Sequence, residues 1–540
     1  MRWFNLFLIC LILFGGGTAV TSAQESPITP TPPTPDRRFG IVEGFWVPEE
    51  TAELNVGWER IIFYWREIQP TGPDDWNTLH VLEEWLTEAR ANGRSVMGLL
   101  KNSPAWATDG AGEAGLPRGL YLPVDDPENL WANYVRRVAT YYGPLGVHDW
   151  VVWNEPEIKP GVFGYEFDGT IDDYVQLLKV TAVVMREVDP EAKIHLAGMT
   201  WWHDVTYLDR LLAAIAAEPD APQHGYYFDA VTLHIYFRSE TVRGITEEVD
   251  GILAKHGFSD KEIWINETNA SPTSDPLWPV TRPQFPINLD QQAWYIVQAY
   301  ALGFAAGADS IGVYKMLDIL LPEGGEAFGI LRPDQSKRPA FEAYKTTIAT
   351  LSHFTEVAIE QETRQAYAIR FEIPRGTAHV VWARTAATAT VTVTASLPTA
   401  VLINATGDTV TELTAVDGVY VIPLTGAICL PTECLVGGEP LFLVQQEPEP
   451  TPTPIPPTET PSPTPSITPS LTPLPPTATP QPTATATVPA TAVPSLTPTP
   501  QATAVAPSAA PSTPSTASLG LWFLGIGAML VVALVIFARR

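Results

Sequence analysis

Apolar residues between positions 39 and 351 follow two alternating periods. Short apolar runs of strand length are each followed by a longer segment in which apolar residues recur every three or four positions, as on one face of a helix. The eight predicted strands are Phe39–Phe45, Arg60–Trp65, Ser95–Lys101, Asp149–Asn154, Lys193–Met199, Phe228–Tyr236, Glu262–Glu267 and Asp309–Met316.

Amphipathic helices are expected between these strands, for example over Leu79–Asn92, Leu130–Tyr142 and Tyr174–Val188. Gly93 and Gly143 follow two of them, where glycine commonly ends a helix. Eight strand–helix units predict an α/β protein with a closed (β/α)8 TIM barrel at residues 39–351. An open doubly wound sheet is the alternative. It is disfavoured because no glycine-rich nucleotide loop follows the first strand.

The pattern changes at residues 355–445, where Val, Thr and Ile alternate in runs such as Ala389–Ala395 and Val419–Leu424. This period of two, with turn sequences such as Pro374-Arg375-Gly376 between the runs, predicts a small antiparallel β-sandwich. The sandwich has two candidate roles, packing against the barrel or binding glycans, and we favour packing.

Both ends of the chain have features of an exported protein. Residues 1–23 combine Arg2 with a short apolar core and small residues, which predicts a secretory signal peptide, with a retained N-terminal anchor as the alternative. Residues 24–38 form a proline-rich segment before the barrel. Residues 446–518 are almost entirely Pro, Thr, Ser and Ala, so they have no apolar periodicity to bury and predict a disordered, extended linker.

Residues 519–538 are uncharged and mainly apolar, and Arg539-Arg540 follow them. This length suits one transmembrane helix with the arginines on the cytoplasmic side. A sorting signal that is cleaved after export is the alternative. We therefore expect an extracytoplasmic protein at the cell surface, held in the membrane by its C-terminal helix.

Charge and cysteine content restrict the partners. The formal net charge of −28 disfavours binding to nucleic acid and docking on anionic lipid. Cys429 and Cys434 are the two cysteines outside the signal segment, and a disulfide closing a small loop is expected in an oxidising compartment. Metal binding there is disfavoured, because no histidine cluster accompanies them.

Two glutamates carry the candidate chemistry. Glu155 lies in Val-Val-Trp-Asn-Glu-Pro and Glu267 in Ile-Trp-Ile-Asn-Glu-Thr, at the C-terminal ends of the predicted fourth and seventh strands. Barrel enzymes place their active sites at this rim. Cleavage of a glycosidic bond with retention needs two carboxyl groups about 5–5.5 Å apart, whereas inversion needs about 6.5–9.5 Å. We expect a retaining glycoside hydrolase, with the inverting type as an alternative.

Further motifs follow in order along the predicted barrel: Trp65-Arg66-Glu67-Ile68-Gln69-Pro70, Ser103-Pro104-Ala105-Trp106, His234-Ile235-Tyr236 and Phe328-Gly329-Ile330-Leu331-Arg332. Together with Asn154-Glu155-Pro156 and Glu267, they make the chain resemble the clan A glycoside hydrolases, which are (β/α)8 retaining enzymes. The resemblance is strongest to glycoside hydrolase family 39 and its family 5 relatives. It implies that Glu155 is the acid/base and Glu267 the nucleophile.

Other side chains near these glutamates are candidate substrate-binding residues. Asn154 is expected to donate a hydrogen bond to the sugar 2-hydroxyl. His234 and Tyr236 are two apart in a strand and so point to the same side. Tyr236 is predicted to hydrogen-bond Glu267 and keep it ionised, and His234 to contact sugar hydroxyls, with a buried core histidine as the alternative. Arg66 is expected to steady Glu267 by its charge, with a surface arginine as the alternative.

Aromatic side chains at the same rim, Trp106 and Tyr314 among them, are expected to stack on sugar rings. No cofactor or metal is expected, because a proton donor and a carboxylate nucleophile suffice for the reaction. The predicted function is a cell-surface β-glycosidase acting on poly- or oligosaccharides. The alternative is a non-catalytic glycan-binding surface protein built on a glycosidase-like barrel.

Overall fold

The computed structural model of the protein describes residues 34–110, 112–281, 283–319, 325 and 327–447, which all belong to one compact unit. The predicted signal peptide at residues 1–23, the linker from residue 448 and the helix at 519–538 lie outside the described residues. Within the described residues, no helix combines the length and the apolar character that crossing a membrane requires.

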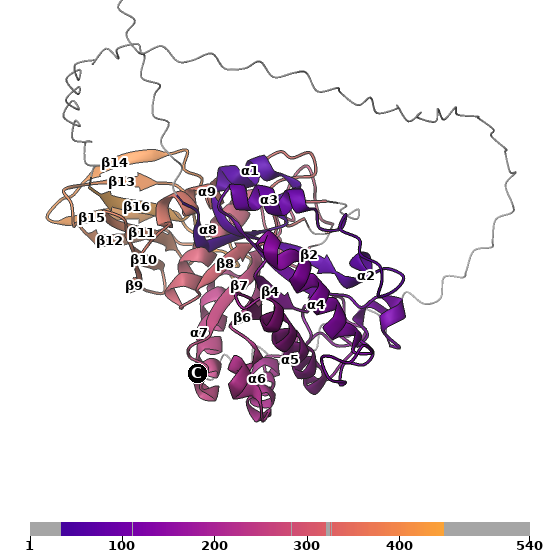
Figure 1. Ribbon diagram of the computed structural model, residues 1–540. Coiled ribbons are helices and arrows are strands. Elements are labelled where there is room, and N and C mark those ends of the chain that lie inside the picture. The colour runs from indigo at the N-terminus through magenta and orange to yellow at the C-terminus, as the bar shows by residue number, and fades with distance from the viewer. Residues whose placement is uncertain (1–33, 111, 282, 320–324, 326, 448–540) are drawn as a thin grey trace, which may run out of the picture. The chain divides into compact units, whose positions relative to one another are not determined.

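Eight parallel strands close into a barrel in their sequence order, as the predicted TIM barrel requires (Figure 1). β8 pairs with β1, where Phe39 lies beside Ile311, and this pairing closes the ring. The strands are β1 (Asp36–Val42), β2 (Val56–Tyr64), β3 (Ser95–Lys101), β4 (Asp149–Val152), β5 (Lys193–His195), β6 (Ala230–Tyr236), β7 (Glu262–Asn269) and β8 (Ser310–Val313).

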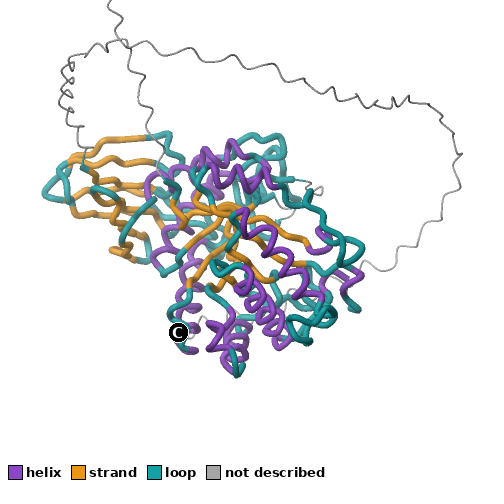
Figure 2. The backbone as a smooth tube through the Cα atoms, in the orientation of Figure 1, coloured by secondary structure: helices purple, strands orange, loops and turns teal. Residues whose placement is uncertain are grey.

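Helices alternate with these strands along the chain (Figure 2). The α-helices are α1 (Pro48–Leu54), α2 (Trp65–Ile68), α3 (Glu83–Ala91), α4 (Leu130–Tyr142), α5 (Ile171–Val188), α6 (Tyr207–Ala217), α7 (Ser239–His256), α8 (Leu289–Ala305) and α9 (Pro339–Leu351). α5 and α8 begin at capping boxes, in which Thr170 with Asp173 and Asn288 with Gln291 satisfy the first free N–H groups.

Apolar side chains fill the N-terminal part of the barrel interior. Trp58 and Ile62 of β2 cluster there with the interior residues of four other strands: Met97, Leu99, Val151, Ala230 and Trp264. The indole of Trp58 lies against Gly40 and Gly312 of the neighbouring strands. A Cβ added to Gly40 would lie 1.9 Å from the indole, and one added to Gly312 would lie 2.4 Å from it. Arg60 is two residues from both Trp58 and Ile62, so β2 also directs Arg60 inward.

β2 begins four residues earlier than the sequence predicted, because it includes a buried acidic residue. Glu59 is completely buried and pairs with the buried Arg94 at 3.3 Å, which offsets part of the cost of removing its charge from water. Burial raises the pKa of Glu59 to about 7, against the opposing charge of Arg94. A charged residue in an otherwise apolar run had placed the predicted boundary too late.

The antiparallel β region predicted after the barrel is confirmed. It contains a six-stranded sheet in the order β14-β13-β16-β11-β10-β9 and a two-stranded sheet of β12 and β15. One apolar cluster includes residues of both sheets, such as Val381, Val391 and Ile422, so the sheets pack face to face. The strands are β9 (Glu356–Glu362), β10 (Ala366–Ile373), β11 (Gly376–Ala383), β12 (Ala389–Thr394), β13 (Thr399–Ile403), β14 (Val410–Thr414), β15 (Val419–Leu424) and β16 (Leu441–Gln446).

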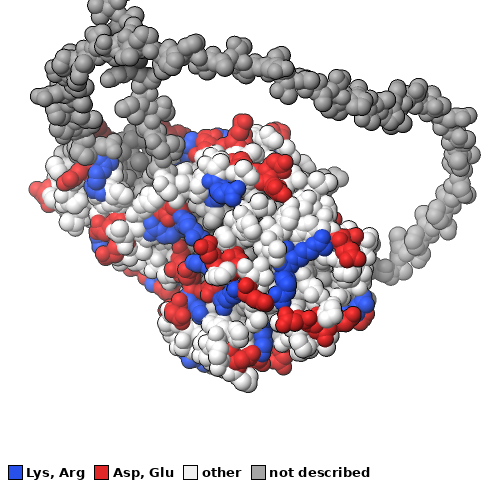
Figure 3. All heavy atoms as spheres, viewed as in Figure 1, with Lys and Arg blue, Asp and Glu red and all other residues white. Residues whose placement is uncertain are grey.

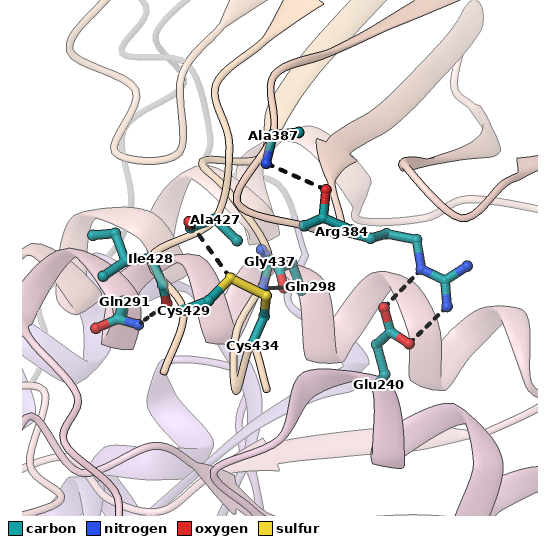
Figure 4. The surroundings of a disulfide bond; sticks show 11 residues. Glu240, Gln291, Gln298, Arg384, Ala387, Ala427, Ile428, Cys429, Cys434 and Gly437 are labelled. Carbon is teal, nitrogen blue, oxygen red and sulfur yellow. Dashed lines mark hydrogen bonds and ion pairs between the residues drawn. A yellow bond between two sulfur atoms is a disulfide. The ribbon is translucent and has the colours of Figure 1, made fainter. Parts of the chain in front are cut away.

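The other face of the six-stranded sheet packs on α8 and α9 of the barrel. Ile369, Phe371 and Val380 of this sheet belong to the same apolar cluster as the barrel's helices. The buried amide of Gln298 on α8 bonds both Gly437 N and Gly438 O, each at 2.9 Å (Figure 4). The β region is therefore built into the barrel's core, which is the packing role that we favoured from the sequence.

The predicted disulfide between Cys429 and Cys434 is present (Figure 4). Inside the loop that it closes, Glu433 forms an ion pair of 2.9 Å with Arg238. Beside the loop, Leu435 O accepts a hydrogen bond from Ser239 N at the start of α7. The bridge thus holds a loop of the β region against the barrel.

Charged side chains of both signs are interspersed over the face drawn in Figure 3. On the described part of that face, Lys and Arg form no continuous patch, and acidic residues lie among them. A duplex or an anionic membrane surface requires a concentrated positive field. The expectation that nucleic acid is not a partner stays a prediction.

Candidate active site

Three titratable side chains from three different strands converge at the C-terminal end of the barrel. Glu155 follows β4, His234 lies in β6 and Glu267 lies in β7. One carboxylate oxygen of each glutamate and one ring nitrogen of His234 all lie within 4.8 Å of one another. Residues remote in sequence thus form one cluster, as the two-glutamate prediction requires.

Glu267 is held by two hydrogen-bond donors and has a histidine nearby. Arg60 binds its Oε1, the Tyr236 hydroxyl donates to its Oε2, and His234 Nδ1 lies 3.5 Å from the same Oε2. Burial opposes the charge on this carboxylate, but the charges of His234 and Arg60 and the bonds from Tyr236 and Arg60 outweigh it. The pKa of Glu267 is therefore lowered to about 2. Tyr236 makes the contact with Glu267 that the sequence predicted.

An irregularity in β7 aims Glu267 into the site. Trp264 faces the barrel interior, so strict alternation would turn Asn266 inward and Glu267 outward. The pairing of β7 with β8 shifts register between Ile265 and Thr268, and the pairing with β6 shifts just before His234 and Glu267 meet. Such bulges redirect single side chains and are common beside active sites.

Glu155 lies in a turn that follows β4 rather than in the strand itself. Trp153 and Glu155 both have positive φ angles, 70° and 44°, an arrangement that costs non-glycine residues about 1–2 kcal/mol each. The main-chain N–H of Glu155 donates to Gly198 O at 3.0 Å, and Glu155 Oε1 lies 2.6 Å from His234 Nδ1. The Glu155 side chain is 17% exposed against 9% for Glu267, so Glu155 is the more open of the two carboxylates.

His234 corrects a prediction. We expected it to contact sugar hydroxyls, but its side chain is fully buried and its Nδ1 faces the two catalytic candidates. Its ring lies against the main chain of Gly198, where an added Cβ would be 2.0 Å from Nε2. Burial disfavours its charge, but the charge of Glu267 and the bond to Glu155 raise the pKa of His234. The imidazole thus lies between the two carboxylates, with Nδ1 directed at both.

Asn154 has a partner that the sequence did not indicate. Its side-chain amide donates to Glu166 Oε2 at 2.8 Å, and Lys101 Nζ donates to the same oxygen at 2.5 Å. Glu166 comes from the loop between β4 and α5, which follows no recognised pattern. The sequence did not indicate that Glu166 binds Asn154 and Lys101, because no local spacing connects this loop glutamate to residues at the ends of β3 and β4.

Arg66 also corrects a prediction, because it pairs with Glu67 and Glu113 near the surface instead of steadying Glu267. Arg60 is the arginine that binds Glu267, and the sequence reasoning missed it. The signal was present, since a charged residue inside a buried strand of this kind needs a buried partner. We had looked past the end of β2 instead of along its interior face.

The two aromatic candidates differ in their surroundings. Tyr314 lies beside the Glu267 cluster, with its ring edge-to-face with Tyr236 at 6.0 Å. Trp106 is half-buried against Trp65, and its indole N–H is bonded to Gln69 O at 2.7 Å, so part of it is structural. A sugar-stacking role stays a prediction for both.

Glu155, His234 and Glu267 are also the one group in the described chain whose geometry is compatible with a bound cation. The chemistry of the donors fits a metal poorly, because the His234 nitrogen that faces both glutamates lies within hydrogen-bonding distance of a carboxylate. The same nitrogen already bonds Glu155. The expectation that no metal takes part stays a prediction.

The fold was compared with solved structures. A family 39 glycoside hydrolase from Bacteroides cellulosilyticus WH2 matches with a TM-score of 0.59 and 16% identity, over 76% of this chain and 81% of that one. A family 39 β-xylosidase from Caulobacter crescentus matches with a TM-score of 0.51 and 18% identity, over 76% and 97% of the two chains. A family 30 endoxylanase from Clostridium papyrosolvens C71 has a TM-score of 0.51 and 11% identity, over the same shares.

The chain has the fold of the clan A glycoside hydrolases. The resemblance predicted from the sequence is confirmed at this level. Among curated proteins, the intracellular exo-α-(1→5)-L-arabinofuranosidase 1 of Bacillus subtilis strain 168 is 26% identical over 180 residues, 33% of this chain. The chain spans about a third of the length of this curated relative, 32%. No family model matches the chain.

In this barrel, Glu155 follows strand four and Glu267 lies near the end of strand seven, as the resemblance implied. Arg60, His234 and Tyr236 surround them on strands two and six. The site thus pairs Glu267, an ionised carboxylate with both oxygens hydrogen-bonded, with Glu155, whose side chain is more exposed. These are the two unlike environments that glycosidic cleavage requires.

Proposed function

We propose that this protein is a retaining glycoside hydrolase that uses Glu267 as nucleophile and Glu155 as acid/base. One observation carries the proposal: oxygens of the two carboxylates lie within 4.8 Å of each other at the mouth of the barrel. This short distance favours the gap of about 5–5.5 Å typical of retaining enzymes over the about 6.5–9.5 Å of inverting ones.

In the first step, a Glu267 oxygen forms a bond to the anomeric carbon while the bond from that carbon to the leaving oxygen breaks. Glu155 gives its proton to the leaving oxygen, so the departing alcohol is neutral. Arg60 and Tyr236 favour the ionised form of Glu267, which is the form that attacks. Because both also stabilise its charge in the resting state, they lower its basicity, and their contribution to the reaction is to position the nucleophile.

In the second step, water attacks the glycosyl-enzyme bond and gives a proton to Glu155, which now acts as base. The sugar leaves with its original configuration, and Glu267 regains its charge. His234 stays between the two carboxylates through both steps. Its Nδ1 lies 2.6 Å from Glu155 Oε1, where a ring N–H would donate to the negative charge that builds on Glu155 when the acid has lost its proton.

The substrate class follows from the relatives. The structurally similar proteins include a β-xylosidase and an endoxylanase, so β-linked xylosides and xylans are the first substrates we propose. The curated relative is an exo-α-(1→5)-L-arabinofuranosidase, so α-L-arabinofuranosides are the second. Both are cleaved by the same pair of glutamates in the proposed mechanism.

We further propose that the enzyme acts at the cell surface. The support is the sequence: a signal-like segment at residues 1–23, a Pro/Thr/Ser linker at 446–518 and an apolar stretch at 519–538. Polymeric substrates cannot enter the cell, so an extended linker would let the barrel reach them from the membrane. Fractionation of cells that produce the full chain, with protease treatment of intact cells, tests this location.

The catalytic proposal is tested with Glu267→Gln and Glu155→Gln on aryl glycosides and oligosaccharides of both proposed classes. Each variant is expected to lose activity by about 10³-fold or more, as removal of an essential catalytic group does elsewhere. Glu262→Gln is the matched control: it lies on the same strand at the opposite end of the barrel and should keep activity. Product configuration, followed by NMR, should be retained.

Full activity in either glutamate variant would overturn the assignment of the two roles. Binding of oligosaccharides without release of any product, by the wild-type chain, would favour a glycan-binding protein on a glycosidase-like barrel. First-formed product of inverted configuration would favour the inverting mechanism despite the short separation of the carboxylates.

A further inference from the structure

Glu166 bonds two residues at the C-terminal end of the barrel and has no part in the mechanism described above. Its Oε2 accepts from Asn154 Nδ2 at 2.8 Å and from Lys101 Nζ at 2.5 Å. Lys101 ends β3, and Asn154 follows β4 and directly precedes Glu155. Glu166 itself comes from the loop between β4 and α5. One carboxylate oxygen of a loop thus joins the ends of two neighbouring strands, next to the proposed acid/base.

The ion pair between Glu166 and Lys101 is largely withdrawn from water. The side chain of Lys101 is 6% exposed and that of Glu166 is 28% exposed. A buried ammonium without a partner is costly, so Lys101 keeps the Glu166 carboxylate beside it. The carbonyl oxygen of Glu166 also accepts from Nε1 of the buried Trp153, at 2.7 Å. Both the side chain and the main chain of Glu166 are therefore fixed to the ends of β3 and β4.

The charge of Glu166 acts in the same opening as the catalytic centre. Tyr64 lies at the end of β2, and Lys101 Nζ is 5.7 Å from the centre of its ring. Burial raises the pKa of Tyr64, the charge of Glu166 raises it further, and the charge of Arg60 opposes the rise. Tyr64 is therefore within electrostatic range both of Glu166 and of the arginine that binds the nucleophile.

The carboxylate of Glu166 decides which side of the Asn154 amide faces it. A carboxylate accepts hydrogen bonds and donates none, so it requires the amide nitrogen and disfavours the amide oxygen. Within the described residues, this is the only hydrogen bond that the Asn154 side chain makes, and it uses one of the two N–H bonds. Turning the amide over would lose a hydrogen bond with a charged group, one of the strong kinds in proteins. The second N–H therefore keeps one direction.

We propose that Glu166 is a positioning residue, which holds the Asn154 amide so that its second N–H donates to the 2-hydroxyl of the sugar. The role rests on the proposed function and on the expected contact of Asn154 with that hydroxyl, which strengthens in the transition state. Glu166 acts through Asn154 and does not touch the substrate. Without the carboxylate, the Asn154 side chain samples several rotamers, and only the productive fraction of molecules makes the contact.

The test compares Glu166→Ala with the wild-type full chain on an aryl β-xyloside and an aryl α-L-arabinofuranoside, each paired with its 2-deoxy analogue. The ratio of kcat/KM between the 2-hydroxyl substrate and its analogue should fall about three- to tenfold, as the productive fraction of Asn154 falls. A merely structural role would lower both values equally and leave the ratio unchanged. Glu113→Ala is the matched control, because Glu113 Oε2 accepts from the amide of Asn102 at 2.9 Å just after β3.

Two further variants show whether Glu166 acts through Asn154. Glu166→Gln keeps an oxygen that can accept from both partners, so it should restore most of the ratio. In an Asn154→Ala background, Glu166→Ala should change the ratio by less than about twofold, because the residue through which it acts is gone. If Glu166→Ala fails to fold with Lys101 left unpaired, Glu166→Ala combined with Lys101→Met removes both charges and replaces it.

The outcomes separate this proposal from the proposed function. An unchanged ratio in a folded, active Glu166→Ala protein would overturn the positioning role and leave the hydrolase intact. A ratio that falls as far in the Asn154→Ala background would also contradict the proposal, because Glu166 would then act without Asn154. If the chain cleaves none of the substrates, calorimetric titration of the same pairs decides. A preference for the 2-hydroxyl sugar that Glu166→Ala lowers would keep the positioning role and refute the hydrolase, and no preference or no binding would overturn both.

Discussion

At the scale of single residues, the two glutamates of the site differ in how many hydrogen-bond donors surround each carboxylate. Glu267 receives bonds from Arg60 and Tyr236 and has His234 nearby, whereas Glu155 has His234 alone among these three. The sequence predicted both glutamates and the Tyr236 contact, because these residues lie at strand ends or at a spacing of two. It did not predict Arg60 or Glu166, whose partners come from strands or loops remote in sequence.

Tyr236→Phe should raise the pKa of Glu267, because it removes one of the bonds that hold the carboxylate ionised. The acid limb of the pH profile of kcat/KM should therefore move to higher pH, and kcat/KM at neutral pH should fall about 10²-fold. The limb is measured on an aryl glycoside over a range that extends down to the pKa of Glu267, about 2, in the wild type. An unmoved acid limb would contradict the role given to Tyr236.

The same substitution has a pH-dependent effect on stability. Because the pKa of Glu267 lies below its usual value of 4.5, its ionisation stabilises the folded protein above that pH. This contribution is lost as the pH falls through about 2. The Tyr236→Phe variant should thus be less stable than the wild type by about 1.5–3 kcal/mol at pH 7, and the difference should shrink in acid. Tyr295→Phe, a buried hydroxyl bonded to Ile235 O and Thr268, should show a pH-independent loss in the same urea titrations.

At the scale of elements, the barrel positions the site through irregular strand ends. β4 stops at Val152 and the chain turns through two positive-φ residues, and β7 shifts register before Glu267. The apolar periods of the sequence predicted these strands. The irregularities could not be predicted, because they depend on the pairing partner, which a strand's own residues do not specify.

Gly198 is a test of this arrangement, because it lies between β5 and β6 and carries the carbonyl that bonds Glu155 N. An alanine methyl would lie 2.0 Å from the buried His234 ring, so the ring must move. Gly198→Ala should therefore lower kcat by about 10²-fold, because small misplacements of a catalytic group have large effects. Gly244→Ala, on α7 with open space around it, is the matched control.

Circular dichroism of Gly198→Ala should still show a folded barrel, since one displaced ring leaves the apolar cluster in place. The measurement is kcat on the substrate identified in the activity screen, together with thermal unfolding. Wild-type kcat in a folded Gly198→Ala protein would mean that His234 does not need its observed position.

At the scale of the whole molecule, the barrel and the β region share one apolar core. The six-stranded sheet buries Ile369 and Phe371 on α8 and α9, and Gln298 ties the two parts by its buried amide. Removing the β region would expose this apolar face of the barrel. Residues 34–351 produced alone should therefore be insoluble, while residues 34–447 should be soluble.

Gln298→Leu should destabilise the protein, because it leaves Gly437 N, Gly438 O and the Ser239 hydroxyl without their buried partner. We expect a loss of about 1–3 kcal/mol in the free energy of unfolding, measured by urea denaturation of residues 34–447. Arg384→Ala is the matched control at the same interface: its pair with the half-exposed Glu240 should contribute about 0–1 kcal/mol. Equal effects of the two variants would contradict a shared buried core.

The sequence by itself determined the succession of strands and helices, the closed barrel, the antiparallel region and the two glutamates at strand ends. These features follow from local periods, from turn residues and from the rule that strand ends of a barrel share one rim. The tertiary structure alone decided that Arg60 rather than Arg66 binds Glu267 and that His234 lies between the carboxylates. The physical reason is that a side chain's partners depend on which distant segments meet in space. The spacing of residues along one strand does not record that information.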